Sequence, residues 1–297
     1  MRVAITGSSG LVGTALRESL TADGHEVIRL VRRPAQAADE VPWDPAAGRL
    51  DPTALESVEA AVNLAGASLF DHRWTRDYRR TIRTSRVGAT HTLATALAAL
   101  PEQPRVLVSG SAIDAYGLDH GSDIIDEDEP TGEGFLAEVC RDWEAAAAPA
   151  VAADIAVCHT RLGPVMTSRG WAFAQMLPFF RLGLGGPLGG GEQYWSPVSL
   201  DDAVRALRFL VETHGCSGPY NVTAPEPLTN AEFTRVLARA VGRPAILPVP
   251  KFALRIRLGG FADQVANSLR VVPARLIEAG FEHRHPDAPA IIAAALR

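Results

Sequence analysis

Lysine is almost missing from this 297-residue sequence, and it has few cysteines and no long apolar run. Of the 29 basic residues 28 are arginines, and Lys251 is the one lysine. The net charge is only -5 and no Lys/Arg-rich block occurs, which argues against nucleic acid or an anionic membrane as the main partner. No uninterrupted apolar run reaches the roughly 18 residues that a membrane span needs.

The three cysteines restrict the redox chemistry that we expect. Cys140, Cys158 and Cys216 are odd in number, widely spaced and without metal-ligand partners in the sequence. Reduced, partly buried thiols are typical of this pattern, so we predict neither a disulfide framework nor a metal site. Met1 leads directly into an apolar β run without a signal peptide, and we therefore expect a cytoplasmic protein.

Strand and helix patterns alternate through the first half of the chain. Strands are predicted at residues 2–6, 26–31, 41–43, 60–64, 105–109 and 154–160, and helices at 11–23, 75–99 and 135–148. This order predicts an α/β fold with a Rossmann-type, doubly wound parallel sheet.

The rhythm changes beyond Gly163, where a smaller C-terminal α/β region is expected. A helix is predicted at 201–213, a capping box at Thr229 and Glu232 opens another, and shorter helices follow Pro273 and Pro286. We expect a nucleotide-binding domain at residues 1–163 plus about 198–220. The substrate region would then comprise residues 164–197 and 221–297.

The first strand breaks into a glycine-rich turn. Residues 3–13 read Val-Ala-Ile-Thr-Gly-Ser-Ser-Gly-Leu-Val-Gly, with glycines at 7, 10 and 13 between a β run and a helical pattern. In this context the glycines let the backbone approach a pyrophosphate, and the helix amino terminus faces its charge. The turn therefore indicates a dinucleotide site.

Two arginines follow the second predicted strand, in the sequence Val31-Arg32-Arg33-Pro34. An NAD-specific site usually has Asp or Glu here to bond the ribose 2′-hydroxyl, whereas a 2′-phosphate needs a cation. Arg32 and Arg33 therefore favour NADP(H) as the cofactor. Because arginine is the default cation of this chain, position rather than residue type carries this argument.

Further segments follow at regular intervals: Asn63-Leu64-Ala65-Gly66, Ser85-Arg86-Val87-Gly88-Ala89-Thr90, Ser109-Gly110-Ser111-Ala112 and Tyr116-Gly117. In order and spacing they resemble the extended short-chain dehydrogenase/reductases, which include nucleotide-sugar epimerases and dehydratases. Residues 43–45, 135–144, 181–189 and 272–281 resemble the atypical epimerase-like branch of that family, which has its own carboxy-terminal segment. The resemblance spans nearly the whole chain.

The resemblance implies which residues hold the cofactor. Those around the pyrophosphate would be Gly7, Ser8, Gly10, Leu11 and Val12. Those on the adenosine side and along the groove would be Arg32, Arg33, Leu64, Ala65, Gly66, Arg86 and Ser109. For Arg86 the alternative is an ordinary surface charge on a helix.

The family's catalytic pair is missing from this sequence. It consists of a tyrosine that gives or takes the substrate proton and a lysine four residues later. The residues four positions after the four tyrosines are Ile82, His120, Val198 and Ala224. On the matching helix the candidate registers pair Phe135 with Val139 or Leu136 with Cys140, and neither provides an activated phenol.

Three residues are our candidates for the missing acid-base chemistry: Ser111, Glu138 and Cys140. Ser111 ends a strand and matches the family's catalytic serine, whereas Glu138 shares its helix with two further carboxylates, Asp142 and Glu144. Each candidate has an alternative role: a satisfied strand-end hydroxyl, a solvated helix surface or an inert packed thiol.

Aromatic residues are the candidates for a substrate pocket: Phe135, Tyr194 and Trp195. The last two follow the glycines at 189–191, which permit motion of a lid. A turn at a domain junction with core aromatics is the alternative.

Together these features predict an NADP(H)-binding oxidoreductase or epimerase-like protein that acts on a small carbonyl or alcohol substrate by hydride transfer, without the Tyr/Lys pair. One alternative is a non-catalytic NADPH-binding sensor or regulatory protein. Another is a nucleotide-sugar epimerase, although no clear grip for a sugar diphosphate is visible. The family resemblance also implies a homodimer formed through the helix at 75–99.

Overall fold

Seven parallel strands form the central sheet. The computed structural model describes residues 1–250, 252 and 259–297, and Lys251 lies outside them. The sheet strands are β1 (Arg2–Thr6), β2 (Glu26–Val31), β3 (Glu40–Pro42), β4 (Ala60–Asn63), β5 (Val106–Ala112), β7 (Ala156–Leu162) and β11 (Gly218–Val222). Their order is β11-β7-β5-β4-β1-β2-β3, with every neighbouring pair parallel.

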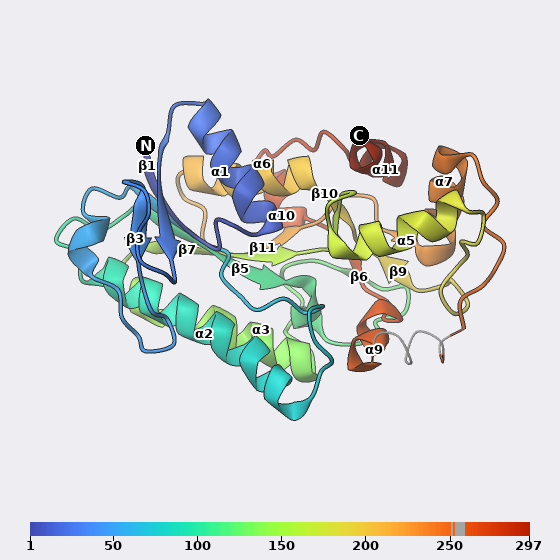
Figure 1. The fold of residues 1–297 in the computed structure, drawn as a ribbon, viewed down its shortest axis with the longest axis horizontal. Coiled ribbons are helices and arrows are strands. Elements are labelled where there is room, and N and C mark those ends of the chain that lie inside the picture. Colours follow the sequence, from blue (N-terminus) through green and yellow to red (C-terminus); the bar gives the residue numbers. More distant parts are fainter. Residues whose placement is uncertain (251, 253–258) are drawn as a thin grey trace.

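Helices cover both faces of this sheet (Figure 1). One layer consists of α1 (Leu11–Ala22), α6 (Leu200–Glu212) and α10 (Ala274–Glu278), and the other of α2 (Arg76–Ala98), α3 (Phe135–Ala145) and α4 (Ala148–Ala152). Because side chains alternate along a strand, Val3 and Ile5 face Leu16 and Leu207 in one core, while Ala4 faces the other. The predicted Rossmann-type α/β fold is confirmed.

The remaining elements gather beyond the carboxyl ends of the strands (Figure 1). They are β8 (Val165–Met166), α5 (Trp171–Arg181), β9 (Tyr194–Trp195), β10 (Val198–Ser199), β12 (Leu228–Thr229), α7 (Asn230–Val241), α9 (Ala262–Val265), β13 (Arg270–Val271) and α11 (Ala288–Leu296). Phe173, Phe233 and Ile291 belong to their shared core. The predicted capping box at Thr229 and Glu232 is present, whereas α5 was not predicted.

Short elements complete the chain: the 3₁₀ turns η1 (Pro52–Leu55), η2 (Ile113–Tyr116) and η3 (Gly259–Phe261), and the strand β6 (Ile124–Ile125). β6 pairs with β13, which joins the loop after β5 to the C-terminal segment. Within the described residues no helix has the length and hydropathy to cross a bilayer. The division into residues 1–163 plus about 198–220 and a separate substrate region stays a prediction.

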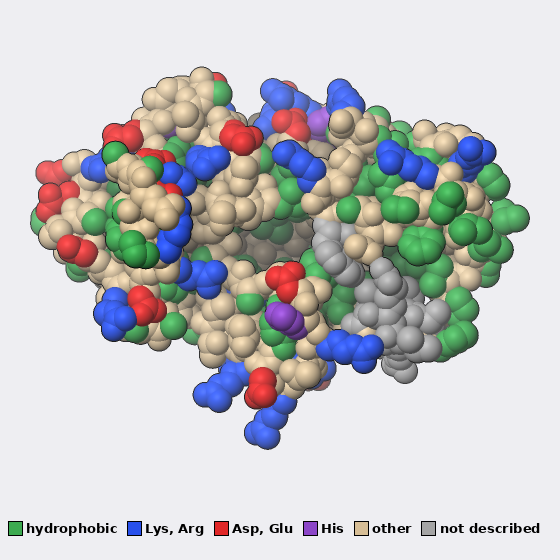
Figure 2. Space-filling model, in the orientation of Figure 1, with side chains coloured by type: hydrophobic (Ala, Val, Ile, Leu, Met, Phe, Trp, Pro, Cys, Tyr) green, Lys and Arg blue, Asp and Glu red, His purple; other side chains and the backbone are tan. Residues whose placement is uncertain are grey.

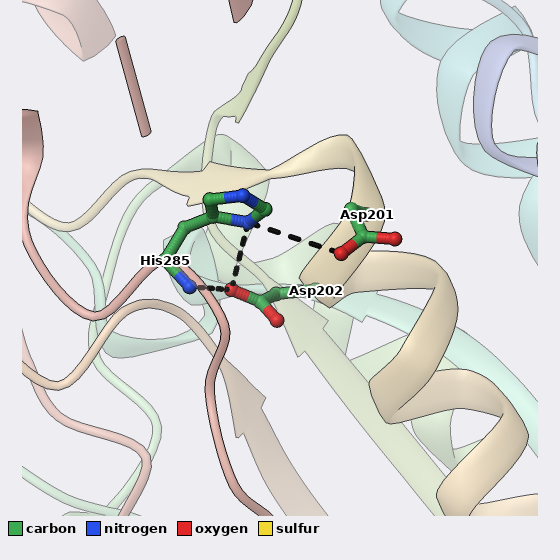
Figure 3. A group of neighbouring side chains, drawn as sticks. All are labelled: Asp201, Asp202 and His285. Carbon is green, nitrogen blue, oxygen red and sulfur yellow. Dashed lines mark hydrogen bonds and ion pairs between the residues drawn. The ribbon is translucent and has the colours of Figure 1, made fainter. Parts of the chain in front are cut away.

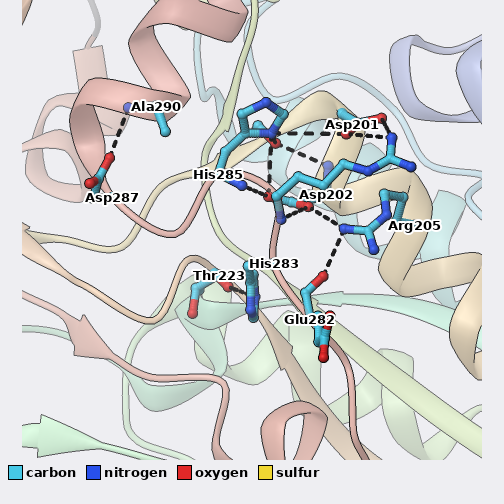
Figure 4. A network of polar contacts seen from close by, with 11 residues as sticks. Asp201, Asp202, Arg205, Thr223, Glu282, His283, His285, Asp287 and Ala290 are labelled. Atoms are coloured by element: carbon cyan, nitrogen blue, oxygen red, sulfur yellow. Dashed lines mark hydrogen bonds and ion pairs between the residues drawn. The ribbon is translucent and has the colours of Figure 1, made fainter.

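Asp202 fastens the C-terminal segment to the start of α6 (Figure 4). Its side chain is 1% exposed and accepts hydrogen bonds from the backbone N–H groups of Arg284 (2.9 Å) and His285 (2.8 Å) and from the Arg205 guanidinium (2.9 Å). Burial acts to raise the pKa of Asp202, but these hydrogen bonds outweigh it and lower that pKa. The carboxylate is therefore a fixed negative charge at the joint between the two parts of the chain.

One group of potential metal ligands is present among the described residues: Asp201, Asp202 and His285, whose ligand atoms lie within 4.8 Å of one another (Figure 3). Protein groups already occupy these atoms, since Asp201 pairs with Arg284 at 3.3 Å and His285 Nδ1 lies 3.0 Å from Ser199 Oγ. Adjacent guanidinium groups also oppose a cation. We interpret the group as a structural clamp.

Replacing Asp202 tests this clamp. Asp202→Ala leaves two backbone N–H groups and Arg205 without their acceptor, and we expect the free energy of unfolding to fall by about 3–5 kcal/mol. Asp201→Ala, at an exposed position, is the matched control and should cost about 1 kcal/mol or less. Urea unfolding at neutral pH measures both.

The effect of Asp202→Ala should also depend on pH. Because the folded-state pKa is lowered, the carboxylate contributes its stability above the ordinary value of 3.8, and the contribution is lost as pH falls through the lowered pKa. The difference in the free energy of unfolding between wild type and variant should therefore become smaller in acid. A difference that is the same at pH 7 and in acid would contradict the assignment.

Candidate functional site

A cavity of about 1880 Å³ opens where the turns after β1, β2 and β4 meet. Eight of the residues predicted to hold a cofactor line it: Gly7, Ser8, Gly10, Arg32, Arg33, Leu64, Ala65 and Gly66. The cavity continues along α2 and reaches α3 at Asp142 and Ala145. The face shown in Figure 2 is hollowed near its middle, between the sheet and the C-terminal region.

Four other predicted residues are not among those that line this cavity: Leu11, Val12, Arg86 and Ser109. Leu11 and Val12 form the first turn of α1 and are half-buried, whereas Ser109 is fully buried within the sheet. The Arg86 guanidinium donates to the carbonyl oxygens of Ala67 (3.0 Å) and Ile82 (3.1 Å). Arg86 therefore supports the loop after β4 and is not a free surface charge.

The glycine turn is shaped by contacts that leave no room for side chains. Gly7 has φ +65°, and a Cβ there would lie 2.5 Å from the carbonyl oxygen of Leu64. A Cβ on Gly13 would lie 2.2 Å from the carbonyl oxygen of Gly7. The backbone at the start of α1 thus lies directly on the turn after β4, and this cradle fits a dinucleotide pyrophosphate.

Buried hydrogen bonds hold the turn after β4 in place. Thr6 Oγ1 donates to Asn63 Oδ1 at 2.6 Å and accepts from the N–H groups of Leu64 (3.1 Å) and Ala65 (3.2 Å). Asn63 in turn donates to Thr90 on α2 at 2.7 Å. The cavity floor is therefore joined to both the sheet and α2.

The two arginines after β2 have different surroundings. Arg33 binds Glu40 through two hydrogen bonds of 2.7 Å, and these bonds lower the pKa of Glu40 to about 2. Arg29 also pairs with Glu40, at 3.0 Å. Arg32 is exposed and has no ion-pair partner in the described part of the chain. Of the predicted pair, Arg32 is the one whose charge is free for a ligand.

Ser111 belongs to a buried charged network. Its hydroxyl donates to Glu144 Oε1 at 2.7 Å, and Arg161 binds the same carboxylate with bonds of 2.9 and 3.0 Å. Arg161 lies over the ring of Tyr116, whose hydroxyl donates to Asn221. Although burial acts to raise the pKa of Glu144, Arg161 lowers it, so this carboxylate is charged.

The other two catalytic candidates lie in contrasting surroundings. Glu138 is exposed on α3, and the structure does not bring it to Ser111. Cys140 is buried near Ser111, with its thiol directed at the carbonyl oxygen of Ala112. Burial raises the pKa of Cys140 to about 12, so the group is a neutral thiol near pH 7.

The predicted pocket aromatics lie in two separate clusters. Phe135 packs edge-on against Trp74, with ring centroids 5.5 Å apart. Trp195 packs on Phe233 at 5.4 Å in the core of the C-terminal region. Arg270 covers the ring of Tyr194 at 4.8 Å.

Sequence reasoning missed Arg161 and Asp114. Asp114 lies in η2, three residues after Ser111, and is half-buried. Burial raises the pKa of Asp114 to about 6, against the opposing effects of a backbone hydrogen bond and of Arg86. The sequence could have pointed to Asp114, because this carboxylate closely follows Ser111, a residue already predicted to belong to the site.

The family comparison matches residues 3–223 to the NAD dependent epimerase/dehydratase family and residues 249–295 to a domain of unknown function, DUF1731. Epimerase family protein Mb2239 of Mycobacterium bovis is 42% identical over 284 residues, which cover 95% of this chain and 93% of that protein. Human epimerase family protein SDR39U1 is 35% identical over 294 residues, which cover 97% of each chain.

Two solved structures are also similar. A crystal structure of human SDR39U1 (isoform 2) with NADPH matches with a TM-score of 0.90 and 32% identity over 99% of both chains. A nucleoside-diphosphate sugar epimerase from Corynebacterium glutamicum matches with a TM-score of 0.83 and 34% identity, over 100% of this chain and 58% of that one.

Two glutamates on α3 provide a matched test of the buried network. Glu144→Ala leaves the buried Arg161 charge without its partner, and we expect a loss of about 3–5 kcal/mol in the free energy of unfolding. Glu138→Ala, at an exposed position on the same helix, should change it by only about 0.5 kcal/mol. Chemical denaturation measures both, and equal losses would contradict the network.

Proposed function

The chain belongs to the NAD dependent epimerase/dehydratase family, and we propose that it binds NADP(H) and transfers hydride between this cofactor and a small carbonyl or alcohol substrate. The free charge of Arg32, at the end of β2, carries the choice of cofactor, because a ribose 2′-phosphate needs a cation there. The similar human protein crystallised with NADPH supports the same choice.

Charge balance around Arg32 supports an anionic group. β2 and the residues after it carry three arginines, Arg29, Arg32 and Arg33, whereas two carboxylates, Asp39 and Glu40, lie at the start of β3. The carboxylates are taken up by Arg29 and Arg33, so Glu40 is unavailable as an acceptor for a ribose hydroxyl. The surplus positive charge suits a phosphate at this end of the cavity.

The cofactor would lie with its pyrophosphate on the Gly7 to Gly13 turn, and when bound it supplies or accepts a hydride at its nicotinamide ring. The chain itself must orient the substrate and move the accompanying proton. Ser111, one residue before the end of β5, would orient a substrate oxygen, but its own proton is directed at Glu144. Proton transfer therefore falls to another group.

A second candidate function is a non-catalytic NADPH-binding sensor. It is favoured by the surroundings of the residues that we expected to replace the tyrosine. The Cys140 thiol is buried, and Glu138 is exposed on α3. If no acid or base serves the site, the same fold binds the cofactor without turning it over.

Arg32 allows a direct test of cofactor choice. Arg32→Ser should weaken NADPH binding by about 10- to 100-fold, which corresponds to the free energy of a hydrogen bond to a charged group. NADH binding should stay unchanged. Arg76→Ser, exposed at the start of α2 and outside the cavity, is the control. Calorimetric titration gives the affinities, and equal wild-type affinities for NADPH and NADH would refute the assignment.

Turnover separates the two candidate functions. NADPH-loaded protein is incubated with a panel of aldehydes and ketones. With at least one of these compounds the absorbance of the reduced nicotinamide should decrease, because hydride moves to the carbonyl carbon. The control omits the protein. Tight NADPH binding without NADPH oxidation by any compound of the panel would instead favour the sensor.

A further inference from the structure

We propose that Asp114 is the group that gives and takes the substrate proton in this site, in place of the missing tyrosine. This inference rests on the proposed function. It adds a catalytic residue that neither the glycine turn nor the arginines identify. Its support is the position of Asp114 directly after β5, its neighbours and the absence of an ion pair among the described residues.

The sheet order puts Asp114 on the nicotinamide side of the cradle. β2, which ends beside Arg32, lies on one side of β1, and β4 and β5 follow on the other side. A dinucleotide whose pyrophosphate lies after β1 and whose 2′-phosphate reaches β2 extends its other half toward β4 and β5. Asp114 follows β5 directly, in η2.

Arg86 connects Asp114 to the cavity wall. A Cβ on Gly66 would lie 3.2 Å from Cγ and Cζ of Arg86, so this side chain lies against a residue that lines the cavity. The guanidinium stacks over Trp143 at 5.1 Å, and its charge acts on Asp114 without forming an ion pair with it.

Asp114 combines partial burial with a carboxyl that no described side chain holds, unlike the acidic groups of α3. Glu144 is held by Ser111 and Arg161, Asp142 is paired with Arg83, and Glu138 is exposed. No ion pair or side-chain hydrogen bond holds the Asp114 carboxyl in the described portion of the chain. Although Asp114 is not among the residues that line the cavity, its carboxyl keeps hydrogen-bonding capacity for the oxygen of a ligand.

The charged and titratable groups that act on or respond to Asp114 come from two helices, Arg86 on α2 and Cys140 on α3, and Cys140 is a neutral thiol. Burial raises the pKa of Asp114 to about 6, while its backbone hydrogen bond and the Arg86 charge oppose that rise. Both the acid and the carboxylate are then populated near neutral pH, as proton transfer in either direction requires.

The proposed step balances in both directions. In reduction, the carbonyl carbon receives the hydride of NADPH while the carbonyl π bond breaks, and its oxygen takes the proton of the Asp114 carboxylic acid. The products are an alcohol, NADP⁺ and the Asp114 carboxylate. In oxidation the carboxylate removes the alcohol proton as hydride returns to NADP⁺.

A titration without substrate tests the placement of Asp114. Protein carrying ¹³C-labelled aspartate should show one carboxyl resonance that titrates near pH 6, and Asp114→Asn should remove it. Asp123→Asn, exposed in the following loop, should retain it. Saturating NADP⁺ should lower this pKa by about one unit or more relative to NADPH, because the oxidised ring places a positive charge nearby.

The outcomes of this titration distinguish the two proposals. If both nucleotides bind but give the same Asp114 pKa, or if Asp114→Asn removes no resonance in this range, the inference is overturned and the cofactor assignment stands. If neither nucleotide binds, the proposed function fails and the inference fails with it.

Kinetics provide the second readout. With a carbonyl substrate that the wild type reduces, Asp114→Asn should lower kcat by about 100- to 10,000-fold and remove the limb of the pH profile near pH 6, while leaving the NADPH affinity unchanged. Asp114→Glu should restore part of the rate, and thermal unfolding checks that the variants are folded. An unchanged kcat and pH profile in Asp114→Asn would overturn the proposal.

Discussion

The contact between the turn after β1 and the turn after β4 is the constraint on which the site depends. Gly7 and Gly13 lack the side chains that would collide with Leu64 and with the turn itself, and Thr6 ties the N–H groups of the β4 turn to β1. This contact sets the cavity floor. It also fixes the direction of a bound dinucleotide, with Arg32 at one end and Asp114 toward the other.

Arginine forms the ion pairs that hold partly or fully buried carboxylates in this lysine-poor chain. Three carboxylates, the buried Glu40 and Asp202 and the half-buried Glu144, are each held by arginine, and each pair stabilises a different joint. The planar guanidinium suits these sites because it binds a carboxylate through two parallel hydrogen bonds. Arginines that serve such pairs are unavailable to ligands, and this makes the free Arg32 informative.

Local patterns in the sequence predicted the sheet, the glycine turn and the capping box at Thr229, because each depends on neighbouring residues. The fifth strand runs to Ala112, three residues beyond its predicted end. The interaction partners of the site residues could not be predicted from the sequence. Arg33 with Glu40 and Ser111 with Glu144 meet only after the chain has folded. Choosing between Glu138 and Glu144 required knowledge of which side of α3 faces the sheet.

The pairing of β6 with β13 bears on the order in which the protein is assembled. All seven strands of the sheet are available once residue 222 has left the ribosome, whereas β6 must wait for Arg270 and Val271. The Asp202 contacts with Arg284 and His285 arrive later still. Since domains generally fold from the N-terminus during synthesis, the cradle for the nucleotide can form while the loop after β5 is still unpaired. The nascent chain therefore gains its cofactor groove before the loop that follows Asp114 acquires its final partners.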